Sequence, residues 1–126
     1  MHDFPVTVFH NPACGTSRNA LAAIEAAGYR PTVIEYLKQG WTRPQLQEIL
    51  AGLGARPRDI LRVRGTQAEA LGLIGPEVSD EAILDAMVAD PILVERPIVR
   101  TPLGVRLCRP ADLVYDLLEA PKQAPD

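Results

Sequence analysis

The first 37 residues read as a strand, a helix and a second strand, and this order constrains the fold more than any other feature. Residues 6–10, which begin with an apolar run at 6–9, are typical of a short buried strand. Apolar residues then recur at helical spacing until Gly28, a residue that commonly follows a helix. Residues 32–37 are rich in β-branched and aromatic side chains and predict a second strand. We expect the two strands to be parallel neighbours joined by a right-handed crossover.

The middle of the chain, about residues 41–90, predicts helices. Thr42 and Gln45 fit a capping box ahead of apolar residues at helical spacing. Ser79 precedes two acidic residues, as is favourable at a helix N-terminus. The segments predicted to form helices or helical turns are 42–53, 57–61, 67–71 and 79–90.

The last third predicts two more strands and a helix. Residues 98–101 and 105–108 are the predicted strands, and the Pro-Leu-Gly between them indicates a hairpin. Pro110 lies near the first position of a closing helix with four apolar residues on one face.

This order, β-α-β, then helices, then β-β-α, is that of an α/β thioredoxin-like fold with a helical insert between its two halves. A chain of 126 residues can bury its own core as one domain. We therefore expect a single domain over residues 1–119, with the insert at about 41–90 and a frayed, Pro-rich tail at 120–126.

Composition and charge exclude several classes of protein. The net charge of −3 argues against general nucleic-acid binding, and no apolar segment is long enough to span a membrane. Residues 1–5 lack the basic and then apolar pattern of a secretion signal. The two cysteines, Cys14 and Cys108, form no disulfide framework and indicate a reducing compartment. We expect a cytoplasmic location.

The basic residues are unusual because eleven of the thirteen are arginine. Arginine suits bidentate recognition of tetrahedral oxyanions, but codon bias in a chain rich in alanine and proline explains the excess equally well. Only particular positions can therefore carry a functional argument. Arg62 and Arg64, after a short predicted helical turn, are by default solvated surface residues.

Cys14 lies in the turn between the first strand and the first helix. At a helix N-terminus, free amide groups and the helix dipole stabilise a thiolate and can also bind an anion. Gly15, the hydroxyls of Thr16 and Ser17 and the cation of Arg18 follow it directly. These neighbours favour a catalytic nucleophile over a buried structural cysteine.

Ser17 stands where a Cys-x-x-Cys motif would have its second cysteine. Turnover would therefore need an external thiol or Cys108. The Ser17 side chain could cap the helix or donate a hydrogen bond to the thiolate. His10 could be a structural hydrogen-bonding partner, or it could stabilise the thiolate or relay protons. Because His2 is the other histidine, no metal site is expected.

Arg96 precedes Pro97 and a predicted strand. In the thioredoxin-like fold the equivalent X-Pro bond is cis and faces the active cysteine, a geometry that is inexpensive only before proline. A cis bond here would place Arg96 beside Cys14. Arg106 and Arg109 fall on opposite faces of the last predicted strand, and the alternation leaves open which of them faces the nucleophile.

Four blocks of this sequence resemble the glutaredoxin-coupled arsenate reductase family. The block around the cysteine reads HNPACGTSRN, and ten near-contiguous matches around a nucleophile are far more specific than a lone Cys-x-x-Ser. The other blocks are residues 61–62, 91–99 and 101–110, in the same order as in the family. The resemblance spans roughly residues 6–118.

The resemblance implies a thioredoxin-like fold and the reduction of arsenate to arsenite. It implies that Cys14 is the nucleophile, forming a covalent thiolate–arsenate adduct that glutathione and glutaredoxin resolve. Arsenate, glutathione and glutaredoxin are thus the implied partners, with glutathione as co-substrate and no bound cofactor. The matching residues are Arg62, Arg96 and Arg109 for oxyanion binding, His10 and Ser17 for thiolate support, and Pro97 as the cis-proline.

The alternative function is a thioredoxin-like, glutathione-dependent thiol oxidoreductase or regulator that does not use arsenate. A redox regulator of this superfamily typically carries a Cys-x-x-Cys switch, which Ser17 excludes. A deglutathionylating relative need not keep Arg62, Arg96 and Arg109 together. A tyrosine-phosphatase loop would need arginine at position 20, where the chain has Ala20.

Overall fold

The computed structural model describes residues 4–119, so the predicted frayed tail at 120–126 lies outside the described residues. The chain divides into two compact units. The first unit comprises residues 1–35 and 96–126, and the second comprises residues 36–95. The predicted insert falls within the second unit, while the assignment of residues 1–119 to a single domain stays a prediction.

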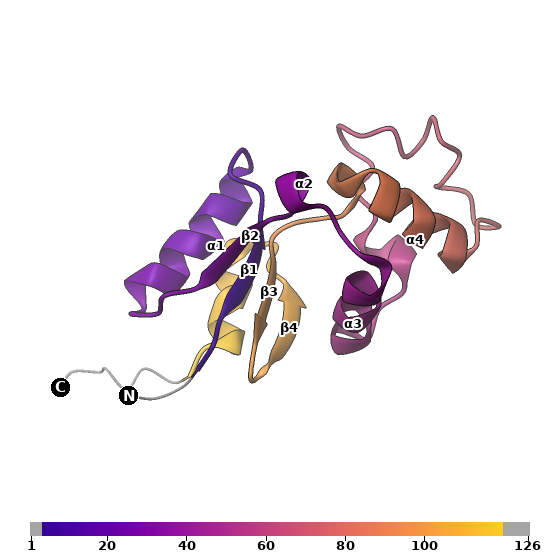
Figure 1. The fold of residues 1–126 in the computed structure, drawn as a ribbon. Coiled ribbons are helices and arrows are strands. Elements are labelled where there is room, and N and C mark those ends of the chain that lie inside the picture. The colour runs from indigo at the N-terminus through magenta and orange to yellow at the C-terminus, as the bar shows by residue number, and fades with distance from the viewer. Residues whose placement is uncertain (1–3, 120–126) are drawn as a thin grey trace. The chain divides into compact units, whose positions relative to one another are not determined.

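The first unit contains a four-stranded mixed sheet in the order β2-β1-β3-β4 (Figure 1). β1 (Thr7–His10) and β2 (Thr32–Glu35) are parallel, with Val8 opposite Val33, as predicted from the strand–helix–strand pattern. Helix α1 (Gly15–Ala26) makes the connection. The second predicted strand ends two residues early, because Tyr36 and Leu37 begin a short helix.

The hairpin of β3 (Ile98–Thr101) and β4 (Gly104–Leu107) completes the sheet. β3 pairs antiparallel with both β1 and β4. Gly104 has a φ of 143°, a conformation that glycine adopts readily at the turn. The last strand was predicted at 105–108, so the observed strand begins and ends one residue earlier.

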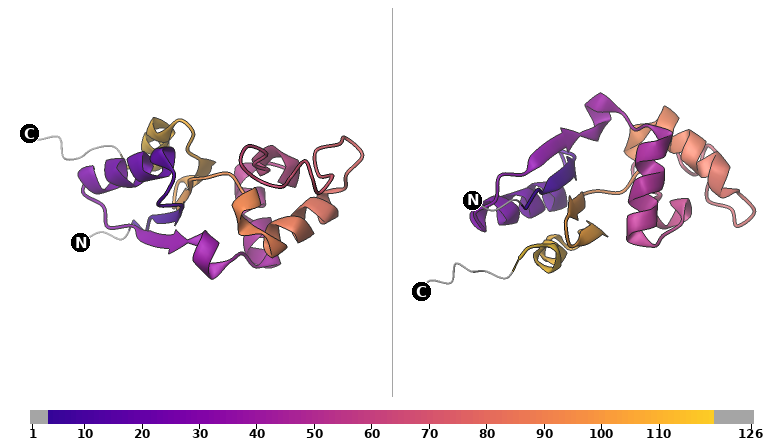
Figure 2. Two further views of the ribbon diagram at one scale, coloured as in Figure 1. Left: turned by 90° about the horizontal axis from the view of Figure 1, so that it is seen from above. Right: turned by 60° about the horizontal axis from the view of Figure 1, so that its bottom comes forward.

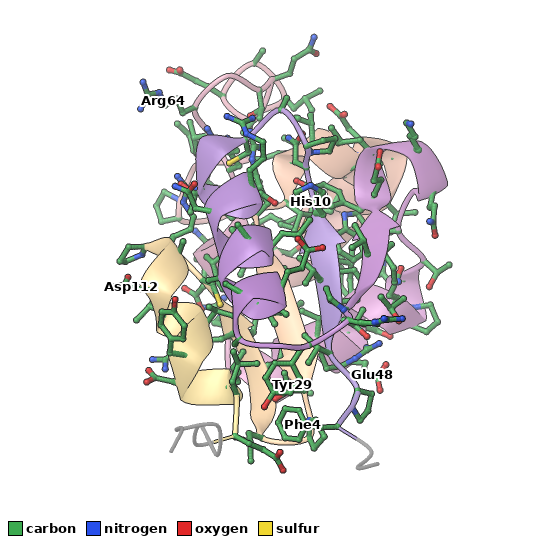
Figure 3. The ribbon with its side chains drawn as sticks, turned by 90° about the vertical axis from the view of Figure 1, so that its left-hand side faces the viewer. Phe4, His10, Tyr29, Glu48, Arg64 and Asp112 are labelled. Atoms are coloured by element: carbon green, nitrogen blue, oxygen red, sulfur yellow. The ribbon has the colours of Figure 1, made fainter. Side chains whose placement is uncertain are left out.

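Helix α1 and the 3₁₀ helix η3 (Ala111–Leu117) pack side by side on one face of the sheet (Figures 1 and 2). Pro110 is the N-cap of η3, and the closing segment is 3₁₀ where an α-helix was predicted. At the other end of β1 from His10, the rings of Phe4 and Tyr29 lie 5.5 Å apart (Figure 3). The buried core of this face consists of Val6, Val8, Ile24, Val99, Cys108, Val114, Leu117 and Leu118.

The second unit begins with α2 (Tyr36–Gln39) and α3 (Arg43–Leu53). The predicted capping box is confirmed, because the Thr42 hydroxyl accepts from the Gln45 N–H and the Gln45 side chain accepts from the Thr42 N–H. Tyr36 is fully buried, stacks on Trp41 at 5.0 Å and donates a hydrogen bond to the Val94 carbonyl. The Tyr36 ring therefore packs within the second unit, although the sequence pattern placed this residue in a strand.

Helical segments predicted at 57–61 and 79–90 are confirmed in the rest of the second unit, while residues 61–79 between them are mostly turns and bends. Ser79 caps α4 (Asp80–Ala89), and η1 (Pro57–Ile60) and α4 pack together. Residues 67–71 form a single hydrogen-bonded turn, which joins the Leu71 N–H to the Gln67 carbonyl over 2.8 Å. A last 3₁₀ turn, η2 (Pro91–Leu93), leads back toward the first unit. Within residues 4–119, no helix is both long and apolar enough to cross a membrane.

Candidate active site

The loop that carries Cys14 is held by hydrogen bonds within itself. Cys14 is the N-cap of α1, and its N–H donates to the Asn11 carbonyl over 3.0 Å. The Asn11 side-chain oxygen accepts from the Ala13 N–H over 3.0 Å, which closes a turn. The Arg18 guanidinium reaches back from α1 to the Pro12 carbonyl over 2.9 Å. The thiol is thus fixed at the first turn of the helix.

The surroundings of Cys14 favour its thiolate. Partial burial opposes ionisation, but four groups outweigh it and lower the pKa of the thiol to about 7. These groups are the backbone N–H of Ser17, the side chains of Arg96 and Arg109, and the backbone N–H of Thr16. Ser17 therefore supports the thiolate through its amide group. Both of these amides belong to the first turn of the helix, where they have no partner within it.

Two arginines that are distant in sequence lie at the thiol. Arg109 Nη1 lies 3.7 Å from Cys14 Sγ and also donates to the Arg96 carbonyl over 2.8 Å. The Arg96–Pro97 bond is cis, as is Arg109–Pro110. Within residues 4–119, Arg96 Nε and Nη1 are buried and have no hydrogen-bond partner. Buried guanidinium N–H groups without partners are costly unless a ligand satisfies them.

His10 lies at the end of β1 (Figure 3) and forms a buried pair with Ser17. His10 Nδ1 lies 2.7 Å from Ser17 Oγ, which also accepts from the Asn11 N–H over 3.1 Å. The Ser17 side chain therefore braces the loop, and the interpretation that it caps the helix is wrong. Burial, with a smaller contribution from Arg18, lowers the pKa of His10 despite the opposing effect of Glu35. The histidine is then neutral at neutral pH and contacts Ser17 directly.

Arg62 belongs to the second unit, where its guanidinium pairs with Glu95 over 2.8 Å. The sequence patterns did not single out Glu95, because its partner lies 33 positions away. Asn11 was also missed as a structural residue, although the Asn-Pro dipeptide is a turn signal that could have identified it.

Cys108 differs sharply from Cys14. Its side chain is fully buried in the core between the sheet and the helices α1 and η3. Burial, reinforced by Asp116 and opposed by Arg106, raises the pKa of the Cys108 thiol to about 12. A thiol of this kind is protonated and poorly reactive at neutral pH.

Replacing Cys108 by serine should therefore leave turnover with an external thiol largely intact, apart from a modest loss of stability caused by the buried hydroxyl. Steady-state rates of the variant and the wild type, with unfolding temperatures as a check on folding, would measure this. Complete loss of activity in a folded variant would show instead that Cys108 resolves an internal disulfide.

The native protein should be alkylated at Cys14 with an apparent pKa near 7, following the thiolate fraction. Because the pKa is lowered, the rate should fall as the pH drops through this value and level off above it. Iodoacetamide labelling across roughly pH 5 to 9, with peptide mass analysis, measures the midpoint. Cys108 is the internal control and should stay unlabelled, whereas a Cys14 midpoint near 9 would contradict this account.

Among residues 4–119, no three His, Cys, Asp or Glu side chains come together as a metal site would require. The site is thus a thiol at a helix N-terminus, with the guanidinium groups of Arg96 and Arg109 beside it. This fold and this site define a thioredoxin-like protein with one reactive cysteine.

The ArsC family matches residues 9–117, and the chain belongs to this family. It is 57% identical over 114 residues to arsenate reductase ArsI2 of Synechocystis sp., covering 90% of this chain and 81% of that protein. It is 51% identical to an arsenate reductase of Rhizobium meliloti, covering 95% of this chain and 86% of that one.

A solved structure of similar fold is the arsenate reductase from Vibrio cholerae. It matches with a TM-score of 0.88 and 34% identity, covering 93% of this chain and all of that one. This likeness confirms the predicted thioredoxin-like fold.

Proposed function

We propose that this protein reduces arsenate to arsenite, with the Cys14 thiolate as the nucleophile. The observation that carries the proposal is the position of Cys14 at a helix N-terminus beside Arg96 and Arg109, a setting that lowers the pKa of the thiol. A thiolate at a positive site can approach an oxyanion that it would otherwise repel. The named arsenate reductases among the relatives support this substrate.

The unpartnered nitrogens of Arg96 support oxyanion binding. Two of its buried guanidinium nitrogens, Nε and Nη1, have no acceptor in the described part of the chain. An arsenate oxygen would supply charge-assisted hydrogen bonds there, and Arg109 would share the negative charge. Arg62, from the second unit, is proposed as the third oxyanion-binding arginine on the resemblance alone.

Three residues, His10, Ser17 and Pro97, are proposed to support the site without contacting arsenate. His10 positions Ser17, and Ser17 holds the loop while its N–H supports the thiolate. Pro97, whose peptide bond with Arg96 is cis, belongs to the site on the resemblance. We assign these residues to positioning. The proposed contacts with the substrate are made by Cys14, Arg62, Arg96 and Arg109.

The proposed reaction moves two electrons to arsenic. Cys14 sulfur attacks As(V), an As–S bond forms and hydroxide leaves. The glutathione thiolate then forms a second As–S bond as another hydroxide leaves. A glutaredoxin thiolate attacks the glutathione sulfur, and the electron pair of that As–S bond reduces the arsenic to As(III). The oxidised product is the glutaredoxin–glutathione mixed disulfide, and water then releases arsenite from Cys14.

The proposal includes glutathione and glutaredoxin, because Ser17 leaves no local resolving thiol. It also includes a reducing, cytoplasmic setting. The test is NADPH oxidation coupled through glutathione reductase, with arsenate, glutathione and glutaredoxin each omitted in turn. Every omission should abolish turnover. Turnover with arsenate but without glutaredoxin would overturn the coupling. Reduction of a glutathione mixed disulfide without any use of arsenate would favour the alternative oxidoreductase.

A further inference from the structure

Arg62 and Glu95 lie on two segments of the second unit that are joined by backbone hydrogen bonds. Leu61 and Val94 form an isolated antiparallel bridge. On either side of it, the Arg62 N–H donates to the Leu93 carbonyl over 2.7 Å, and the Glu95 N–H donates to the Ile60 carbonyl over 2.9 Å. The backbones that carry the two side chains are therefore held together, independently of the ion pair.

The ion pair uses only part of the arginine. Arg62 Nη1 donates to Glu95 Oε1 over 2.8 Å, and the two side chains are 16% and 24% exposed. A guanidinium group has five N–H donors, so a single-nitrogen contact leaves the others available to an anion. The contact also restricts a side chain that otherwise has considerable rotamer freedom.

We propose that Glu95 is a positioning residue that holds the Arg62 guanidinium ready for the oxyanion. This inference rests on the proposed role of Arg62 in arsenate binding. An arginine fixed before the ligand arrives loses less conformational entropy on binding, which strengthens affinity without adding a contact. The negative charge of Glu95 acts in the opposite sense, because it repels an anion. The acceptor oxygen and the charge can be separated experimentally.

The two effects separate in Glu95→Gln and Glu95→Ala. Glutamine keeps an acceptor oxygen and removes the charge, so its KM for arsenate should be at or below that of the wild type. Alanine removes both, and its KM should rise about three- to tenfold, with kcat changed less than about twofold. Asp85→Ala, which removes an exposed partner of Arg43 in the same unit, is the matched control and should leave KM unchanged.

A double-mutant cycle with Arg62→Ala decides whether Glu95 acts through Arg62. Glu95→Ala should have no effect on KM in the Arg62→Ala background. An equal rise in KM in both backgrounds, no rise in either, or a raised KM for Glu95→Gln would overturn the inference. If Arg62→Ala alone leaves KM unchanged, the proposed role of Arg62 fails and the inference fails with it. If Arg62→Ala raises KM and Glu95→Ala does not, only the inference fails.

Discussion

Cys14→Ser should abolish arsenate-dependent NADPH oxidation in the coupled assay, with a loss of roughly a thousandfold or more. A serine hydroxyl at this position stays protonated at neutral pH, whereas the surroundings bring the pKa of the thiol to about 7. Serine also cannot form the As–S bond that passes electrons to the thiol partners. The measurement is the arsenate-dependent rate at saturating glutathione and glutaredoxin.

The matched control is Cys108→Ser, the same substitution at the buried cysteine. The unfolding temperature of Cys14→Ser should stay close to that of the wild type, because the side chain is only partly buried. Substantial turnover by folded Cys14→Ser would mean that another group attacks arsenate.

Arg109→Ala should lower kcat/KM for arsenate by roughly 10- to 150-fold, the equivalent of losing a charged hydrogen bond worth about 1.5–3 kcal/mol. Two effects combine, because Arg109 lies 3.7 Å from Cys14 Sγ and helps to lower the pKa of the thiol. The acidic limb of the pH profile should therefore move to higher pH. Rates measured across the pH range separate this shift from the loss of anion binding.

Arg106→Ala is the control for that variant. Arg106 lies on β4 and pairs with exposed Asp116 over 2.6 Å, which is a surface ion pair of small energetic value. Its removal should leave kcat/KM within about twofold and the pH profile in place. Equal losses in Arg106→Ala and Arg109→Ala would show that general positive charge matters, and that contact with the thiol does not.

Strand alternation alone could not choose between Arg106 and Arg109, although the family resemblance indicated Arg109. Strand alternation was extended to residue 108, but β4 ends at Leu107. The Arg109 N–H then bonds to the Leu107 carbonyl over 3.1 Å, in a turn where alternation no longer applies. The side chain of Arg109 thereby reaches Cys14, while Arg106 keeps its place on the strand. An error of one residue at the end of the strand is therefore enough to prevent the prediction that Arg109 reaches Cys14.

A contact beyond the local pattern also explains the error at residues 36 and 37. Tyr36 and Leu37 continue an apolar, β-prone pattern, yet they begin α2. Tyr36 is buried against Trp41, a contact within the second unit that outweighs its local preference for a strand. By contrast, the caps of α3 and α4 were predicted well, because Thr42 and Ser79 act on amides only three residues away.

Local features of this protein follow from the sequence by itself: the strand–helix turn that carries Cys14, the helix caps, the hairpin and the absence of a second cysteine at Ser17. Each depends on residues a few positions apart, so backbone geometry and short-range hydrogen bonds suffice. The local patterns made the place of Arg96 depend on a cis bond and left Arg109 open. The tertiary structure brought both arginines to the thiol, buried Cys108 and paired Glu95 with Arg62. These outcomes depend on distant segments packing together, where burial and charge decide which side chains ionise, which stay inert and which can meet an anion.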